Sequence, residues 1–187
     1  MPNPRLASRY AKSLLGLAVE KGLLEQVYAD MQLLNEVCRS NRDFTNLLKS
    51  PIVNADTKKR IMDAVTAGRI SEMTRSFNSL LITKGRESNL PEITKAFISQ
   101  YKEYKNIHTV KLTTAVPVSD TLRQAIKDRV KQASGFENIE FDEHVDDKII
   151  GGFVLQIGDQ LIDGSIAYDL KNIARQFDNN DFIYKIR

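Results

Sequence analysis

One segment near the end of the chain, IIGGFVLQIGDQLIDGS from Ile149 to Ser165, constrains the local fold more than any other. Its residues alternate with the period of a β-strand, and Phe153, Leu155 and Ile157 share one strongly apolar face. Gly158-Asp159 supplies a two-residue turn, with glycine where φ has to be positive. The pattern therefore predicts two antiparallel strands joined as a hairpin.

A helix is expected directly after this hairpin. Ser165 stands where the second strand ends, and its hydroxyl suits a helix N-cap. Apolar residues then recur at helical spacing, which gives the helix one apolar stripe: Ile166, Leu170, Ile173 and Phe177. Such a stripe predicts that the helix packs back on the sheet.

The first 106 residues predict helices only, separated by short breaks that contain glycine or proline. Six helices joined in this way are typical of a bundle. The expected ranges are about 5–21, 24–40, 44–49, from Asn54 or Asp56 to Gly68, 71–84, and from near Pro91 to 104.

Residues 107–187 change character and predict a small α+β domain. A β-branched strand over 109–115 is followed by a helix capped by Ser119, and Ile139, Phe141 and Val145 alternate in a further strand. The hairpin and the last helix complete this part. The fold class predicted for the whole chain is therefore mixed, an all-α six-helix bundle in 1–106 and an α+β domain in 107–187.

Composition limits the class of protein. No apolar run in the 187 residues approaches the ~20 that a membrane-spanning helix needs. The N-terminus lacks the apolar stretch of a secretory signal, and the single cysteine suits a reducing compartment. These features predict a protein of the bacterial cytoplasm, or a mature form without its targeting segment.

Charge is divided unevenly along the chain. Residues 1–106 carry a net +6 and residues 107–187 a net −3, within a total of +3. Two domains that face different partners would explain this asymmetry, and so would chance among solvated faces. The modest positive charge and the absence of clustered arginine argue against nucleic-acid binding.

The first predicted helix has more apolar surface than one buried side needs. Leu6, Tyr10, Leu14 and Leu17 occupy one sector, and alanine, leucine and valine side chains widen the apolar arc to roughly 220°, about twice a normal stripe. Either this helix is central in its own bundle or a partner covers one of its sides.

The fifth predicted helix shows the same excess more weakly. Met73, Phe77, Leu80 and Leu81 form its expected core face, whereas Ile82 points away from that face. A groove between the first and fifth helices would receive an amphipathic helix from another chain. The pattern alone leaves internal packing and a partner groove open.

The C-terminal segment quoted above resembles the signature of the delta-subunit family of F-type ATP synthases, whose mitochondrial relatives are the oligomycin-sensitivity-conferring proteins. In the first half, Tyr10-Ala11-Lys12 is similar to the family's helix-one motif. Gly85-Arg86 and Leu90-Pro91 are similar to its turn between helices five and six. The resemblance spans nearly the whole chain in domain order and length.

This resemblance implies a non-catalytic stator subunit without a cofactor. Residues 1–106 would bind the N-terminal helix of the alpha subunit, and residues 107–187 would bind the C-terminal region of the b subunits. For the alpha contact it implies Tyr10, Ala11, Ser13, Leu14, Phe77 and Leu80. For the b contact it implies only a region, Gly152 to Phe177, while the tail Asp181–Arg187 has no assigned role. Membrane association would arise only through the complex, at the cytoplasmic face of the inner membrane.

Few residues suggest catalysis. The sequence has no phosphate-binding glycine loop, no paired CxxC motif, no HExxH and no nucleophile elbow, and its lone thiol, Cys38, lies in an apolar stripe. One acidic cluster offers metal-ligand chemistry: Asp142, Glu143, His144, Asp146 and Asp147. Along a strand, however, neighbours face opposite sides, so a solvated strand end or a face for a basic partner explains the cluster better than a metal site.

Two other functions remain open beside the stator. A helical adaptor unrelated to ATP synthesis fits the wide apolar arc of the first helix equally well, and a metal-dependent hydrolase would use Asp142 and His144. The basic run at 58–60 is expected to be the solvated side of the fourth helix.

Overall fold

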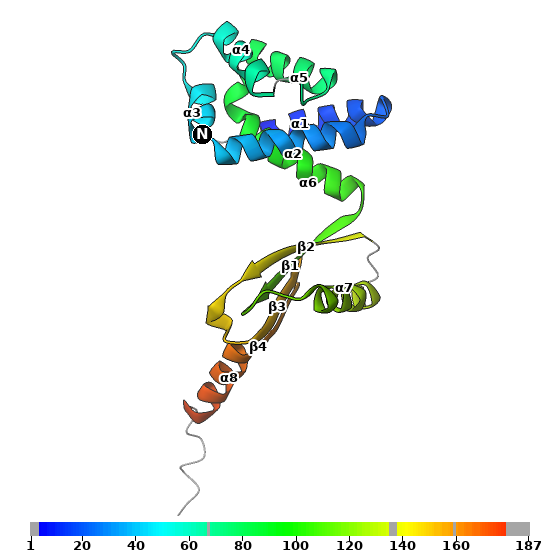
Figure 1. Ribbon diagram of the computed structural model, residues 1–187, viewed down its shortest axis with the longest axis vertical. Helices are drawn as coiled ribbons and strands as arrows, with labels where there is room; N and C mark the ends of the chain where they lie inside the picture. The colour runs from blue at the N-terminus through cyan, green and yellow to red at the C-terminus, as the bar shows by residue number, and fades with distance from the viewer. Residues whose placement is uncertain (1–3, 67, 135–137, 159, 179–187) are drawn as a thin grey trace, which may run out of the picture. The chain divides into compact units, whose positions relative to one another are not determined.

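The computed structural model describes residues 4–66, 68–134, 138–158 and 160–178. The chain divides into two compact units, Met1–Lys105 and Asn106–Arg187 (Figure 1). Helices fill the first unit and a small sheet with two helices forms the second, which confirms the predicted fold class. The predicted role of Asp159 in the turn and the tail Asp181–Arg187 lie outside the described residues.

The helices of the first unit begin and end close to their predicted positions. Their bounds are α1 (Pro4–Glu20), α2 (Leu24–Ser40), α3 (Arg42–Lys49), α4 (Ala55–Thr66), α5 (Glu72–Thr83) and α6 (Leu90–Tyr104), with a short 3-10 turn, η1 (Glu87–Asn89), between the last two. Local chemistry explains these ends. Asn41 accepts a hydrogen bond from the Phe44 N–H as N-cap of α3, and Ser71 accepts one from the Thr74 N–H as N-cap of α5.

Helix α6 is the centre of this bundle, because it packs against both α1 and α2. Its buried side carries Leu90, Ile93 and Phe97, which are fully shielded from solvent. The facing helices contribute small and branched side chains that complete the core: Ala7, Ala11, Leu14 and Ala18 from α1, and Val27, Met31 and Leu34 from α2. The alanines of α1 let α6 approach closely.

The second unit is built on a four-stranded sheet with strand order β2-β1-β3-β4. Strand β1 (Ile107–Thr114) pairs parallel with β2 (Asn138–Val145) and antiparallel with β3 (Gly152–Ile157), which pairs antiparallel with β4 (Gln160–Ser165). The parallel pair needs a crossover, and α7 (Asp120–Ser134) supplies it. Its residues pack on one face of the sheet around Val110, Leu112, Val130, Ile139 and Leu155.

Two glycines of this unit fulfil special backbone roles. Gly158 has φ +56° at the start of the β3–β4 turn, as the hairpin pattern predicts. Gly152 has φ +77°, and a Cβ there would lie 2.1 Å from the carbonyl oxygen of Gly164. The close approach of β3 to β4 at this point therefore requires glycine.

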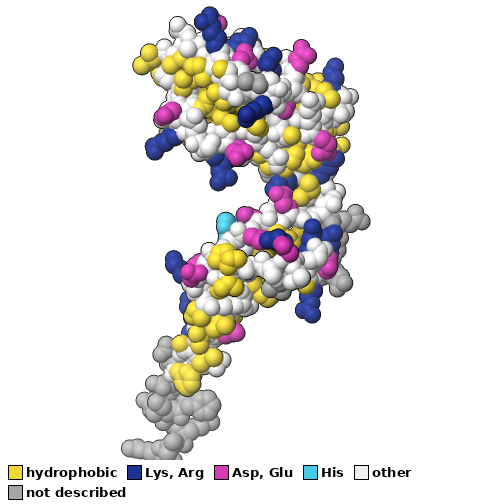
Figure 2. All heavy atoms as spheres, viewed as in Figure 1, with side chains coloured by type: hydrophobic (Ala, Val, Ile, Leu, Met, Phe, Trp, Pro, Cys, Tyr) yellow, Lys and Arg dark blue, Asp and Glu magenta, His cyan; other side chains and the backbone are white. Residues whose placement is uncertain are grey.

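The last helix, α8 (Ile166–Asp178), does not pack back on the sheet, which corrects the prediction. Its apolar stripe stays open, since Leu170 is 51% exposed, Ile173 48% and Phe177 79%. The cause is the absence of a loop, because β4 ends at Ser165 and α8 begins at the next residue. Ser165 caps the helix by accepting a 3.1 Å hydrogen bond from the Tyr168 N–H. Figure 2 shows the resulting hydrophobic side chains along α8.

Among the described residues, no helix combines the length and the apolar character that crossing a bilayer requires.

Candidate helix-binding groove

The first unit contains an open groove of about 840 Å³ between α1 and α5. The two helices run antiparallel along it, because Arg86, three residues beyond the end of α5, lines one pocket together with Arg5 and Arg9 at the start of α1. The lining is mainly apolar. The lining residues are Tyr10, Ser13, Leu14, Leu17, Lys21 and Leu23 on the α1 side, and Glu72, Met73, Ser76, Phe77 and Leu80 on α5.

Five of the six residues implied for the alpha contact line this groove. Tyr10 and Phe77 meet across it edge to face, with ring centroids 6.4 Å apart and planes at 67°. Leu80 is 46% exposed on the opposite wall, and Ser13 presents a small exposed side chain between Tyr10 and Leu17. The structure thus brings residues from both helices into one surface that solvent reaches.

Ala11 is the exception and needs a correction. Its side chain is 0% exposed on the buried side of α1, one turn from Ala7 and two turns from Ala18, and it does not line the groove. At 100° per residue, Ala11 follows Ala7 by one turn and shares its buried face. Its small size serves packing inside the bundle.

Helix α5 is rotated relative to the predicted orientation. The prediction placed Leu80 in the core and Ile82 outside it, but Leu80 is 46% exposed and Ile82 only 6%. The buried stripe follows Thr74, Asn78 and Ile82, together with Phe77 and Leu81. Because two of these residues are polar, the hydrophobic pattern concealed the true core face, and Leu80 is free to form the groove wall.

Buried polar contacts hold the α5 wall in place. Asp30 of α2, only 4% exposed, accepts hydrogen bonds at Oδ2 from the Ser71 N–H at 2.9 Å and from the Thr74 hydroxyl at 2.7 Å. The Ser71 hydroxyl donates to the same oxygen. One carboxylate oxygen thus anchors the first turn of α5 to α2.

The basic run at 58–60 is not entirely solvated, contrary to expectation. Lys58 is 4% exposed, and its Nζ donates to Glu87 Oε1 at 2.7 Å and to the Leu48 carbonyl at 3.0 Å. Burial is possible because both contacts satisfy the ammonium group. This ion pair links α4 to η1, the turn that follows α5.

The acidic cluster of β2 is dispersed rather than gathered around a metal site. Glu143 binds the Arg123 guanidinium of α7 through both carboxylate oxygens, and Asp146 Oδ1 accepts from the Lys148 N–H at 3.0 Å. Asp142 and His144 lie on one side, 3.6 Å apart. Across the described ranges, no group of three or more His, Cys, Asp or Glu is placed to hold a metal ion.

The second unit has an apolar groove of its own, of about 510 Å³, between α7 and the β3–β4 hairpin. Phe153 and Ile162 line it and are 39% and 54% exposed, and Ile126, Val130, Leu155 and Ile157 complete the apolar lining. Arg129 stands at the edge. Helix α7 therefore leaves part of its own sheet face open.

Comparison with known proteins identifies the family. The family model described as ATP synthase delta (OSCP) subunit matches residues 6–177. The chain belongs to this family. The match spans α1 through nearly all of α8, including both grooves.

Proteins named ATP synthase subunit delta are similar to it over almost their whole length. That of Cytophaga hutchinsonii is 40% identical over 95% of this chain and 96% of its own. That of Christiangramia forsetii is 32% identical over the full length of both. A chain from the cryo-EM structure of the Toxoplasma gondii mitochondrial ATP synthase hexamer shares the fold, with a TM-score of 0.70 and 21% identity over 92% of this chain and 97% of that one.

Six groove residues of this delta-family chain are not among the residues implied for the alpha contact: Leu17, Lys21, Leu23, Glu72, Met73 and Ser76. Leu17 is 43% exposed in the groove, and Met73 and Ser76 line the α5 side. Leu17 shares a helical sector with Tyr10 and Leu14, so the over-wide apolar arc already contained its signal. Met73 was assigned to the core face, and Ser76 has no hydrophobic signal.

Proposed function

We propose that the chain is the non-catalytic stator subunit of an F-type ATP synthase, joining the catalytic head to the peripheral stalk. The observation that carries this proposal is the open α1–α5 groove, lined by half-buried Tyr10 and by exposed Leu17 and Leu80, in a chain of the delta family. A chain in this role must hold two partners and resist rotor torque. It needs affinity and stiffness, and no reacting group.

The groove suits the N-terminal helix of an alpha subunit. Helix α1 has 17 residues, so its wall is about 25 Å long at 1.5 Å per residue, enough for four to five turns of an incoming helix. Tyr10 and Leu17 lie about two turns apart on α1, and Leu80 lies on the opposite wall. Together they offer an apolar surface to the apolar face of an amphipathic helix. Ser13 and Ser76 are small lining residues, so the backbone of the partner helix can approach closely.

The second unit supplies the surface proposed for the b subunits. The open stripe of α8 and the groove lined by Phe153 and Ile162 both fall within the expected region Gly152–Phe177. Exposed apolar residues gathered along one helix and in one groove are typical of protein–protein interaction sites. The b C-terminal region is the occupant that the family resemblance implies.

Two contacts in one chain make a firm joint from moderate affinities. Once one unit is bound, the other meets its partner at a high effective concentration, so release requires both contacts to break together. Membrane association then follows from assembly, at the cytoplasmic face of the bacterial inner membrane.

The alpha contact is tested with the full chain and a peptide that copies the N-terminal segment of the alpha subunit of the same organism. Tyr10→Asp and Leu80→Asp each bury a charge against the apolar face of the peptide, so we expect at least about tenfold weaker binding by calorimetry. Val65→Asp in α4 is the control, because Val65 is 37% exposed and outside the groove. Unchanged binding by both groove variants would refute the assignment.

The b contact is tested separately with a peptide from the C-terminal region of the b subunit. Leu170→Asp and Ile173→Asp change exposed residues, so stability should stay within about 0.5 kcal/mol while b binding falls sharply. Gln176→Asp on the same helix is the charge-matched control. Normal b binding by both stripe variants would exclude α8 from the contact.

A further inference from the structure

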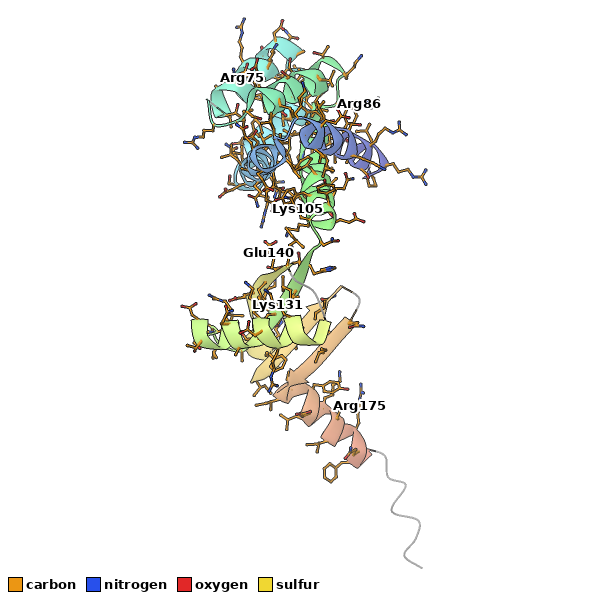
Figure 3. The ribbon with its side chains drawn as sticks, turned by 90° about the vertical axis from the view of Figure 1, so that its right-hand side faces the viewer. Arg75, Arg86, Lys105, Lys131, Glu140 and Arg175 are labelled. Carbon is orange, nitrogen blue, oxygen red and sulfur yellow. The ribbon has the colours of Figure 1, made fainter. Side chains whose placement is uncertain are left out.

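Three arginines surround a second pocket, of about 450 Å³, beside the N-terminal half of α1. Arg5 and Arg9 lie one turn apart on α1, and Arg86 joins them from the turn before η1. Figure 3 shows Arg86 beside α1. Leu6, Tyr10 and Ser13 form the rest of the lining.

This arginine pocket is continuous with the α1–α5 groove. Tyr10 and Ser13 line both, and the residues Leu6, Tyr10, Ser13 and Leu17 follow one face of α1 at spacings of three and four. A helix lying along the groove would therefore extend over the pocket. The same surface is apolar in its middle and strongly basic at one end.

The opposite end of the groove has no such charge. Lys21 and Glu72 line it, one of each sign. Apolar side chains alone would accept an amphipathic helix in either direction. A charge difference between the two ends breaks that symmetry, because one end favours carboxylates and the other is neutral.

The acidic residue nearest in sequence is already engaged elsewhere. Glu87 follows Arg86, but its Oε1 accepts from the buried Lys58 ammonium at 2.7 Å. Across the described residues, none of the three arginine side chains forms an ion pair or a side-chain hydrogen bond. The same Lys58–Glu87 contact fixes η1, and with it the position from which Arg86 reaches α1.

We propose that the arginine pocket binds carboxylate side chains at one end of the helix held in the α1–α5 groove, and thereby sets the direction and register of that helix. The inference rests on the proposed function and adds the chemistry of the partner. Three like charges around one pocket repel one another, and bound carboxylates relieve this repulsion. Guanidinium groups suit them because each presents a planar fork of donors.

The test uses the full chain and two peptides. One copies the N-terminal segment of the alpha subunit of the same organism, and the other replaces its acidic residues with glutamine or asparagine. The variants are Arg5→Gln, Arg9→Gln, Arg86→Gln and the triple variant. Lys12→Gln is the control, because Lys12 carries the same charge on α1 and lines neither pocket.

We expect each single arginine variant to bind the native peptide about threefold more weakly, and the triple variant on the order of tenfold or more. Their affinity for the neutralised peptide should equal that of the unsubstituted chain. Raising the salt concentration should weaken the native complex more than the triple-variant complex. Lys12→Gln should bind both peptides nearly as the unsubstituted chain does.

Three results overturn the inference while leaving the proposed function intact. The first is binding of the native peptide that is unchanged in the triple variant, and the second is an alpha N-terminal segment that carries no acidic residue. Equal losses of affinity for the native and the neutralised peptide in the arginine variants would also overturn it, because they would indicate a general change in the groove rather than the loss of a carboxylate contact. Failure of the unsubstituted chain to bind the native peptide would remove the proposed function together with the inference.

Discussion

Thr74 on α5 donates a 2.7 Å hydrogen bond to the buried carboxylate of Asp30 on α2, 44 positions earlier in the chain. The same oxygen accepts from the backbone and hydroxyl of Ser71, so the N-cap of α5 is itself anchored. The groove wall formed by Phe77 and Leu80 continues from this point. The position of the α5 wall thus depends on a buried contact behind that wall, because Asp30 is 4% exposed.

Asp30→Ala should destabilise the first unit by about 3 kcal/mol, because it takes the acceptor from three donors, the buried Thr74 hydroxyl and the half-buried N–H and hydroxyl of Ser71. Urea unfolding of the full chain, followed by amide hydrogen exchange in α5, measures the loss. Asp30→Asn keeps one acceptor oxygen and should cost less. Glu36→Ala, an exposed acidic residue on the same helix, is the control. A cost for Asp30→Ala no larger than that control would contradict the anchoring role.

Glu25 should make the first unit less stable in acid. Its pKa lies below the ordinary value of 4.5, first because of the hydrogen bond from Lys105 and then because of the one from Tyr101. A pKa lowered by folding stabilises the fold above the unfolded value, and this contribution disappears as the pH falls through the folded value. Glu25→Gln should therefore flatten the acid side of the stability profile measured by urea unfolding between pH 6 and pH 3.

An NMR titration gives an independent check on the same carboxylate. The Glu25 carboxyl should titrate at higher pH in Lys105→Gln than in the unsubstituted chain, because the 2.7 Å ion pair with Lys105 is removed. An equal Glu25 pKa in Lys105→Gln and in the unsubstituted chain would exclude the ion pair as the cause of the lowered pKa.

Cys38 should react slowly with alkylating reagents while the protein is folded. Burial, reinforced by the nearby Glu92 charge, raises the pKa of its thiol to about 11. At pH 8 only about one thiol in a thousand is then the reactive thiolate. Mass spectrometry after iodoacetamide treatment should show little labelling in buffer and fast labelling in guanidinium chloride. Equal rates in both solvents would contradict this prediction.

Gly152→Ala should disrupt the pairing of β3 with β4. The new Cβ would lie 2.1 Å from the Gly164 carbonyl oxygen at a residue with φ +77°, so backbone must move, at a cost of about 3 kcal/mol or more. Gly158→Ala is the matched control, since its φ is also positive but no atom lies within 4 Å, and should cost about 1 kcal/mol. Hydrogen exchange of the β3 and β4 amides compares the two.

Local chemistry explains why most element boundaries are predictable from the sequence. The cap residues Ser71 and Ser165 act within three positions of their partners, and the positive φ of Gly22 and Gly85 ends helices through the backbone alone. The hairpin pattern likewise needs only neighbouring residues. Interactions that span so few residues can be recognised in any short window of the sequence.

Contacts between distant segments explain the errors. Lys58 is buried because Glu87 lies opposite it, 29 positions away, and no local pattern shows that pairing. The predicted core face of α5 is wrong because Thr74 and Asn78 are polar but buried. The Thr74 hydroxyl is buried because it donates a hydrogen bond to Asp30 of another helix. The apolar stripe of α8 is predicted correctly, but the spacing of its residues does not show whether the segment that packs on it belongs to the same chain. The apolar groove residues of α1 were predictable as a surplus of apolar surface, whereas Phe77 and Leu80 of α5 were implied only by the family resemblance. The arginine pocket required the turn at Arg86 to be placed beside α1.

The exposed apolar stripe of α8 also affects how long the protein lasts before assembly. A newly made copy presents leucine, isoleucine and phenylalanine on a protruding helix, which is the kind of surface that chaperones and quality-control proteases recognise. Under the proposed function a partner covers that helix, and the signal then disappears. Copies made in excess of their partners should therefore be short-lived, so that the cellular amount of the protein follows the number of finished complexes rather than its own rate of synthesis.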